Sequence, residues 1–297
     1  MDYTSEDLVK IKKILFDLLC FFDSFCSQNG LKYYASNGTC LGAIRHHGFI
    51  PWDDDIDVLM PRKDYEKFLT LKPLLKTLGY EIYSVFDDGY YLPYAKICET
   101  KTTLVELKNR PFLLGQFIDV FPMDEAEDSE QCRKFFEEKR KSIQKYSRCL
   151  DRSLWREFLK ESVFLKKAKK LGLFLFRKIL KSFFLKKFLA TEEKIKRQTG
   201  PFFMSYVSDY EFEKKLHNKE WFGDGVRVPF ECGTIVVPSN YDAYLTKLFG
   251  NYMAPPPVEK RVSHHYHYFY DFDKRWSLED VMKLDLEEQK IIDYKYE

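Results

Sequence analysis

Four aspartates stand within five positions at the start of an apolar run, and this segment constrains the fold more than any other. It reads GFIPWDDDIDVLMP and spans residues 48–61. The aspartates are Asp53, Asp54, Asp55 and Asp57. Two like charges about 4 Å apart repel by roughly 4 kcal/mol at an effective dielectric constant near 20, so a partly buried carboxylate cluster predicts a cation nearby. An acidic turn or a set of helix caps is the alternative, but neither explains the hydrophobic strand that begins inside the cluster.

The spacing of the aspartates favours a hard metal ion. Successive side chains of a strand alternate between its faces, so Asp53, Asp55 and Asp57 would share a face if the strand begins early. At ~3.3 Å per residue, the Cα atoms of Asp55 and Asp57 would lie about 6.5 to 7 Å apart, within reach of one Mg²⁺ or Mn²⁺. Asp119, in the apolar segment FIDVFPMD (117–124), is the candidate third carboxylate on a neighbouring strand.

A glycine-containing turn precedes the aspartates, in SNGTCLGAIRHHG (36–48). Gly38 would let the backbone approach a phosphate, and Thr39 would offer a hydroxyl and an N–H at a helix start. Arg45, one to two turns later, could reach the same phosphate. A tight turn between a strand and a helix is the plain alternative. A glycine turn, a short helix and a strand with Asp-x-Asp together are typical of the nucleotidyltransferase fold, where the turn holds phosphates and the carboxylates hold metal.

Periodicity predicts the remaining elements. Apolar positions recur every three to four residues from 8 to 22, between the N-cap candidate Thr4 and the stop signal Asn29-Gly30. Short strands are expected at 31–36, 55–60, 80–86, 91–99, 102–108, 115–124, 227–231 and 233–238, and helices at 61–71, 129–199 and 240–250.

We therefore predict an α+β protein with an N-terminal helix. A nucleotidyltransferase-like mixed-sheet core is expected in residues 1–128 and a Lys-rich helical insertion in 129–199. Residues 200–297 would complete the core and carry a Pro-rich segment that contains histidines. His264, His265 and His267 resemble a metal cluster, but in such a segment we expect them to pack or to contact substrate.

The helical stretch holds most of the basic charge. The whole chain has a net charge of +2, yet residues 133–197 contain 22 Lys and Arg against 7 Asp and Glu. At 100° per residue, the apolar and basic side chains of 162–190 fall on opposite sides of a helix. Such a helix can lie in an anionic membrane interface or pack on the domain with a solvated Lys face, and both interpretations stay open. Nucleic acid is not expected as a partner, because no aromatic stacking platform interleaves with these lysines.

The location is expected to be cytoplasmic, with the inner face of the membrane as a candidate site. The N-terminus has no apolar signal segment, and no run of about 18 uncharged apolar residues occurs. The seven cysteines form no Cys-x-x-Cys pair, which favours reduced thiols.

The longest recognisable segment, NGTCLGAIRHHGFIPWDDDIDVLMPRKDYEKF (37–68), resembles the LicD signature GTLLGA-R-GFIPWDDDID. FIDVFPMD and YLTKLFGNYMAPPPVEKRVSHH (244–265) also resemble LicD family segments. The likeness spans roughly residues 30–125 and 220–265, with Cys40 where the signature has leucine. The family is similar to fukutin-related transferases, which share the nucleotidyltransferase-like fold.

The resemblance implies transfer of a phospho-alcohol, typically phosphocholine, from a CDP-alcohol such as CDP-choline. The acceptor would be a hydroxyl of a cell-surface glycan or lipid-linked precursor, of lipopolysaccharide or teichoic-acid type, and CMP would leave. Asp55 and Asp57 would hold the metal, with Asp119 as third ligand or as general base. Lys96 and Arg45 would meet the phosphates, although Lys96 could equally protect an edge strand.

Two other functions remain open on the sequence. A plain nucleotidyltransferase would use the same glycine turn and Asp-x-Asp to move NMP, and it would release pyrophosphate instead of CMP. A glycan- or membrane-binding protein with a degenerate site is the non-enzymatic alternative. Trp52 would either wall the site or pack in the core.

Overall fold

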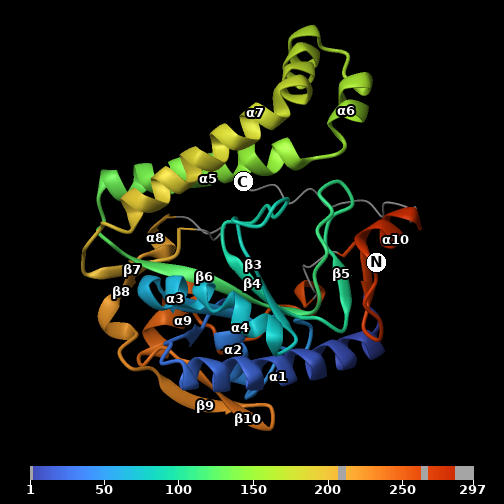
Figure 1. Cartoon of the computed structure of the whole chain (residues 1–297). Coiled ribbons are helices and arrows are strands. Elements are labelled where there is room, and N and C mark those ends of the chain that lie inside the picture. The colour runs from blue at the N-terminus through green and yellow to red at the C-terminus, as the bar shows by residue number, and fades with distance from the viewer. Residues whose placement is uncertain (1–2, 207–211, 262–266, 285–297) are drawn as a thin grey trace.

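A mixed β-sheet forms the centre of the computed structural model, which describes residues 3–206, 212–261 and 267–284 (Figure 1). Five strands run in the spatial order β1 (Tyr34–Ala35), β2 (Asp57–Pro61), β6 (Phe117–Ala126), β4 (Ala95–Glu99) and β3 (Tyr80–Tyr83). β7 (Phe202–Met204) pairs with the end of β6, and β8 (His217–Asn218) pairs with β7. β2 and β6 are parallel, whereas the other pairs of this sheet are antiparallel. The predicted α+β class with a mixed sheet is confirmed.

The N-terminal helix α1 (Ser5–Gln28) forms as its sequence predicts. Thr4 caps it in a capping box with Asp7, and Gly30 follows its end with a φ of +59°. The apolar face of α1 joins the main core, together with the side chains of β2 and β6 that point away from Asp57. The buried residues of this helix are Ile11, Leu15, Leu18, Leu19, Phe22, Phe25 and Cys26.

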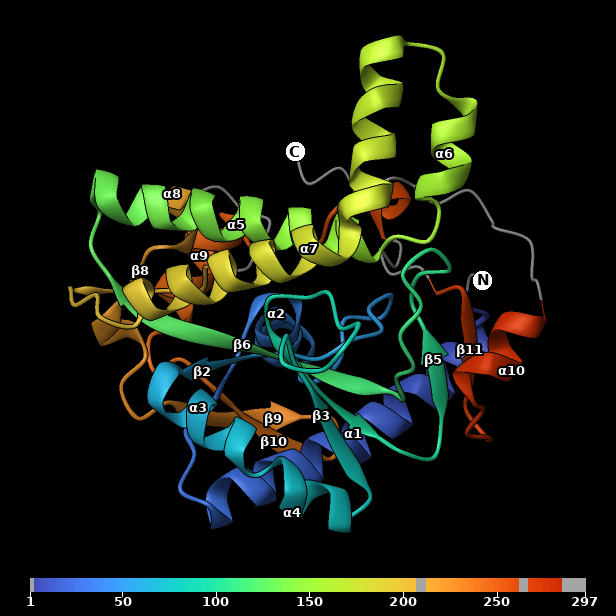
Figure 2. The same cartoon turned by 45° about the horizontal axis from the view of Figure 1, so that its top comes forward.

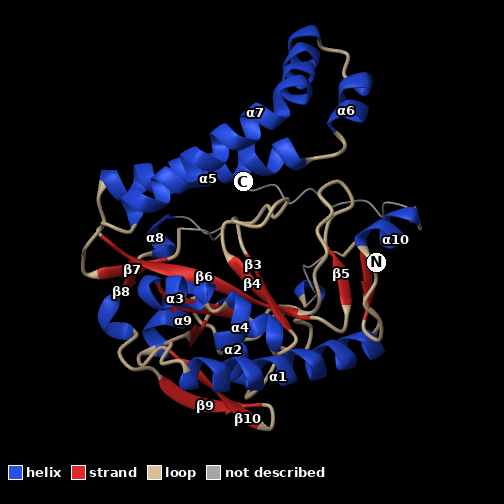
Figure 3. Ribbon diagram, viewed as in Figure 1, coloured by secondary structure: helices blue, strands red, loops and turns tan. Residues whose placement is uncertain are grey.

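Shorter elements surround the sheet (Figure 3). α2 (Asn37–His46) links β1 to the loop before β2, and α3 (Arg62–Thr70) and α4 (Lys72–Thr77) follow β2. The hairpin β9 (Val226–Phe230) and β10 (Gly233–Val237) is followed by α9 (Tyr241–Phe249), and β5 (Thr103–Val105) pairs with β11 (Phe269–Asp271). The remaining elements are α8 (Phe212–Lys215), α10 (Leu278–Lys283) and the 3₁₀ turns Lys219–Trp221 and Val258–Lys260.

The basic region folds into three helices, α5 (Glu130–Leu150), α6 (Leu154–Lys160) and α7 (Phe164–Ile195). α5 lies alongside the second half of α7 above the sheet, whereas α6 and the first half of α7 project beyond the core (Figures 1 and 2). The chain leaves the sheet at Ala126 and re-enters it at Phe202, which is the register partner of Ala126. Both ends of the helical region are therefore held by one strand pair.

A buried ion-pair network fastens these helices to the sheet. Arg62, at the start of α3, donates to both carboxylate oxygens of Asp124 on β6 at 2.7 Å. Its other nitrogen lies 3.0 Å from Glu192 of α7, which also pairs with Lys139 of α5. Pairing satisfies charges that burial would otherwise penalise, so the network fixes where the helices meet the core.

Candidate active site

Three charged residues of the central strands form one row. Asp119 on β6 is the register partner of Asp57 on β2 and also of Lys96 on β4. Register partners on adjacent strands point to the same face of a sheet, and neighbouring strands lie about 4.8 Å apart. The two aspartates and the lysine therefore share one face, opposite the apolar side chains of Val58 and Val120.

Asp119 and Lys96 form a buried ion pair. The Lys96 ammonium donates to Oδ1 of Asp119 at 2.7 Å and lies 3.4 Å from Glu106. Burial raises the pKa of Asp119 to about 7, with a further rise from Asp57 opposed by Lys96. Burial would lower the pKa of Lys96, but Asp119 and Glu106 raise it above its ordinary value. Asp119 thus titrates near neutral pH beside a permanent cation.

The interpretation of Lys96 as an edge-strand lysine is wrong. Its strand, β4, lies between β6 and β3, and the Lys96 side chain is only 1% exposed. The ammonium also lies 3.3 Å from the centroid of the Phe117 ring. Alternation of apolar and polar residues in a short segment cannot distinguish an edge strand from an inner strand that carries a buried charge.

Asp57 is fixed to the beginning of α2. The Asn37 amide donates to Oδ2 of Asp57 at 3.0 Å, and the backbone N–H of Asp57 donates to the Thr39 hydroxyl at 2.8 Å. The Ser36 N–H donates in turn to the Asp57 carbonyl at 3.0 Å. The Thr39 hydroxyl, predicted to meet a phosphate, here positions the backbone of Asp57.

Gly38 is needed for close approach, but the group that approaches is a carboxylate. A Cβ at this position would lie 2.7 Å from Oδ2 of Asp53. Any side chain on residue 38 would therefore displace Asp53. The structure brings Gly38, Thr39, Asp53 and Asp57 together at the N-terminal end of α2.

The strand does not begin early. β2 starts at Asp57, so Asp53 and Asp55 lie in the loop before it and the strand alternation does not govern their direction. The loop makes a turn in which the Asp53 N–H donates to the Ile50 carbonyl. Asp54 is buried, with Oδ2 at 3.8 Å from Nε2 of His267. The expectation that alternate aspartates share a strand face is thus corrected.

Arg45 does not join the row. It lies in the last turn of α2, whereas Gly38 and Thr39 lie in the first. Its guanidinium donates to the Tyr252 carbonyl at 2.8 Å and to the ring of His46 at 2.9 Å. The expected reach across one to two turns fails because these bonds hold the side chain at the other end of the helix.

The structure also places Trp52 and His267, two aromatic residues that the sequence singled out. Trp52 is half-buried and packs against the main core, beside the guanidinium of Arg261. His267 is buried with its ring 5.0 Å from that of Tyr3. His264 and His265 lie outside the described residues.

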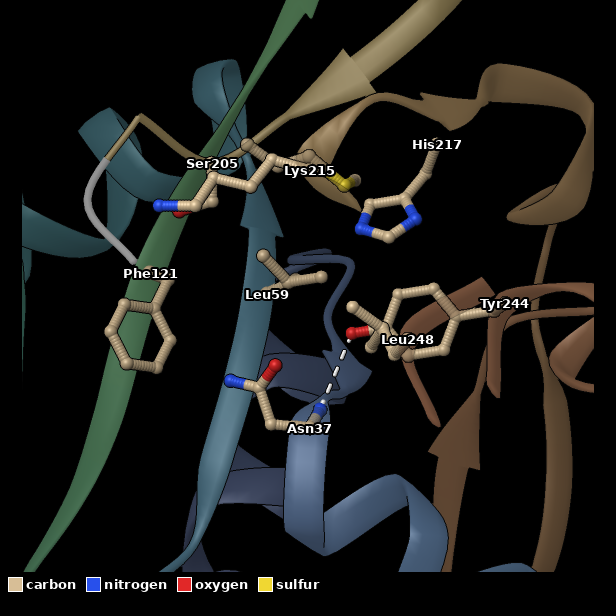
Figure 4. A pocket seen from close by; sticks show the side chains of 9 residues that line it. Asn37, Leu59, Phe121, Ser205, Lys215, His217, Tyr244 and Leu248 are labelled. Carbon is tan, nitrogen blue, oxygen red and sulfur yellow. Dashed lines mark hydrogen bonds between the residues drawn. The ribbon is translucent and has the colours of Figure 1, made fainter. Parts of the chain in front are cut away.

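A pocket adjoins the carboxylate row on the same face of the sheet (Figure 4). Leu59 and Phe121, two residues beyond Asp57 and Asp119 on their strands, are among its lining residues. The full lining is Asn37, Leu59, Phe121, Met123, Ser205, Lys215, His217, Tyr244 and Leu248, around a space that is partly open to solvent. Burial, and then Lys247, lowers the pKa of His217 to about 3, so its ring is neutral.

Sequence reasoning missed most of this pocket. Asn37 stands beside Gly38 in the glycine turn, and its N–H donates to the Tyr244 hydroxyl at 3.3 Å. Tyr244 opens the segment YLTKLFG, so both residues had a motif that could have indicated them. Lys215 and His217 had none, because Lys215 ends the four-residue helix α8 and His217 lies in β8, a strand of two residues that only its pairing with β7 places here.

The carboxylates of Asp57 and Asp119 meet some of the requirements for binding a hard divalent cation. Among the described residues, no group of three or more His, Cys, Asp or Glu side chains is arranged to hold a metal ion. Mg²⁺ commonly binds through one or two carboxylates, with waters and substrate phosphates completing its shell. The paired carboxylates of Asp57 and Asp119 fit that pattern of use, and Asp55 precedes Asp57 by two residues.

Comparison with known proteins identifies the same family as the sequence motifs do. The family described as LicD/FKTN/FKRP, nucleotidyltransferase domain, matches residues 30–165. The lipopolysaccharide cholinephosphotransferase LicD of Haemophilus influenzae is 30% identical over 256 residues, which cover 85% of this chain and 93% of that protein. Uncharacterized proteins of Rickettsia typhi and Rickettsia prowazekii are 40% and 35% identical over 68 residues, 23% of this chain and 22% and 26% of theirs.

Proposed function

The chain belongs to the LicD family of transferases, and we propose that it moves phosphocholine from CDP-choline to a hydroxyl of a cell-surface glycan such as lipopolysaccharide. CMP is the other product. The relative that covers most of this chain is named as a lipopolysaccharide cholinephosphotransferase, which supports both the transferred group and the acceptor class. The observation that carries the proposal is the register pairing of Asp57 with Asp119 beside the start of α2.

Asp57 and Asp119 would hold Mg²⁺ or Mn²⁺, with Asp55 as the third proposed ligand. A bound divalent cation would neutralise the negative charge that develops on the departing CMP. Asn37 orients the Asp57 carboxylate, and Thr39 fixes the backbone from which it projects. These contacts keep the carboxylate in place while the donor binds and leaves.

Asp119 is also suited to take a proton from the acceptor hydroxyl. A general base works best when its pKa lies near the operating pH, and burial raises the pKa of Asp119 to about 7. Lys96 bonds to Oδ1, so we assign Oδ2 to the cation or to the acceptor hydroxyl. Lys96 thus positions Asp119 instead of meeting the donor phosphates.

The pocket in Figure 4 would receive part of the donor. It lies next to the carboxylate pair and combines apolar walls with a few polar groups, as small-molecule sites usually do. With a substrate there, the diphosphate would lie between the carboxylate row and the first turn of α2.

Product analysis tests the proposal directly. The purified protein is incubated with Mg²⁺, a choline-free lipopolysaccharide and, in turn, the CDP-linked forms of choline, ethanolamine, ribitol and glycerol. We expect CMP release with CDP-choline and phosphocholine on the glycan, both measured by phosphorus NMR. Pyrophosphate release from nucleoside triphosphates, with no CMP from any CDP-alcohol, would instead establish a plain nucleotidyltransferase. No turnover of either donor class would favour a binding protein.

A further inference from the structure

The helical region carries an unpartnered apolar stripe. Six large side chains along α7 are between 56% and 80% exposed. They are Phe164, Leu165, Leu175, Phe176, Ile179 and Phe183. Leu159, in the last turn of α6, and Val163, the N-cap of α7, extend it with two further exposed apolar side chains.

This stripe lies opposite the side of α7 that packs on the protein. The packed side chains Phe184, Leu185, Phe188 and Leu189 contact Ile143 and Tyr146 of α5. At 100° per residue, the centre of the exposed stripe lies about half a turn of the helix away from this packed side. The six side chains of the stripe are therefore not core, whereas the second half of α7 does pack on α5 through its opposite side.

Basic charge borders the stripe. Residues 162–190 contain nine Lys and Arg and no Asp or Glu. Exposed Lys169 and Lys187 lie along one edge, and exposed Lys178 lies along the other. By contrast, Lys170 pairs with Glu161 and Lys181 pairs with Asp88, so these two lysines act within the fold.

We propose that α6 and the exposed stripe of α7 dock the protein on an anionic lipid surface. The apolar side chains would enter the boundary between headgroups and acyl chains, and the bordering lysines would contact lipid phosphates. A second copy of this chain does not suit the stripe, because two acid-free basic faces would repel each other. Described helices include none that is long and apolar enough to cross a bilayer, which leaves docking in the interface.

Sedimentation with vesicles tests the proposal on the full chain. Vesicles of phosphatidylcholine alone and of phosphatidylcholine with 40% phosphatidylglycerol are compared at low and high salt. We expect the protein in the pellet with anionic vesicles at low salt. Binding should weaken strongly at 1 M salt, where the Debye length is about 3 Å.

Three variants separate the contributions. Leu175→Glu/Phe176→Glu/Ile179→Glu should abolish pelleting. Lys169→Gln/Lys178→Gln/Lys187→Gln should weaken it more than tenfold, because each lysine near an anionic surface contributes roughly a fivefold factor. Val9→Glu/Leu78→Glu/Phe86→Glu is the matched control, since it changes three exposed apolar residues outside the helical region and should bind as wild type does. Circular dichroism confirms that each variant is folded.

Several results would overturn the proposal. Wild-type protein in the supernatant under every condition would exclude lipid as the occupant. Equal loss of binding in the control triple variant would exclude the stripe as the contact. A doubled mass by light scattering that returns to the monomer mass in the α7 triple variant would assign the stripe to a second copy. Binding is measured without donor or acceptor, so its failure leaves the proposed transfer untouched.

Discussion

Asp119 shows how a single buried side chain is tuned by its neighbours. Burial raises its pKa, Lys96 lowers it and Asp57 raises it, so that the resulting pKa is about 7. The pKa of this group in the folded chain is higher than its ordinary value of 3.8, so the folded state binds more protons between about pH 4 and pH 7. Its contribution to stability is therefore greatest below pH 4 and falls as the pH rises through 7.

A pH profile tests this balance. The activity should have an acidic limb at or below pH 7, because only the ionised form of Asp119 can hold a cation or take the proton of the acceptor hydroxyl. Lys96→Met should move this limb to higher pH, since the ammonium that lowers the pKa is lost. The measurement is kcat/KM against pH for both proteins, with the exposed Lys63→Met as control. An unmoved limb in Lys96→Met would assign the titration to another group.

Asp57→Asn should nearly abolish transfer and leave the fold intact. Asparagine keeps the shape of the side chain and can still accept from Asn37, but it removes the charge that would hold a cation. We expect a loss of roughly 10²-fold or more in kcat, and a slightly higher Tm in metal-free buffer because like-charge repulsion is relieved. Turnover and thermal melts check this, with the exposed Asp224→Asn as control. A variant with more than about a tenth of wild-type activity would remove Asp57 from the site.

The two glycines of α2 should respond differently to alanine. At Gly42 a Cβ would lie 2.5 Å from the Gly48 carbonyl oxygen and 3.2 Å from the Ile50 nitrogen, both of which are backbone atoms. Gly42→Ala should therefore destabilise the protein by about 1–3 kcal/mol. At Gly38 the nearest group is the Asp53 carboxylate, which can rotate away, so Gly38→Ala should lower activity with little change in stability. Urea unfolding of the two variants, beside activity assays, gives the comparison.

Among the elements, helices and strand positions could be predicted more readily than strand limits. α1 carries its own cap and a regular apolar face, so its bounds follow from local sequence. β1 has only two paired residues and β2 begins at Asp57, because pairing with neighbouring strands sets these limits. β7, β8 and β11 are two or three residues long, which is too short for a period to appear.

The site residues also differ in how far the sequence alone could predict their positions. The choice of Asp57 and Asp119 relied on acidic residues in apolar strands, and the register of β2 with β6 places them side by side. The position of the Arg45 side chain could not be predicted from local spacing. It depends on the direction of the side chain along α2 and on a hydrogen bond to the Tyr252 carbonyl, which is more than 200 residues away. Whether Lys96 lay at an edge or inside depended on strand order, which the sequence pattern does not contain.

The network between α3, α5, α7 and β6 predicts acid sensitivity. Burial would raise the pKa of Glu192, but Lys139 and Arg62 lower it below its ordinary value of 4.5. Its stabilising contribution is therefore present above that value and is lost as the pH falls through the lower pKa of the folded state. Glu192→Gln should destabilise by about 3–5 kcal/mol at pH 7, and the difference should shrink near pH 3. Urea unfolding at both pH values checks this, and the exposed neighbour Glu193→Gln should show neither effect.

At the scale of the whole molecule, donor and cation should bind together. CDP-choline should raise the Tm in the presence of Mg²⁺ by mass action, because a ligand that binds only the folded state stabilises it. After chelation with EDTA the shift should disappear, since the diphosphate would meet the carboxylates of Asp57 and Asp119 with no divalent cation between them. Asp57→Asn should show no shift in either buffer. Equal stabilisation with and without EDTA would mean that no cation connects donor and protein.

The chain departs from the sheet at Ala126 and returns at Phe202, and these two residues face each other across one ladder. The 75 residues between these points can thus be lengthened, shortened or exchanged without shifting the register that aligns Asp57 with Asp119. The residues of the carboxylate row and the helices that surround them can therefore change independently of each other in evolution. Selection can therefore replace the outer helices while the row of Asp57, Asp119 and Lys96 stays as it was.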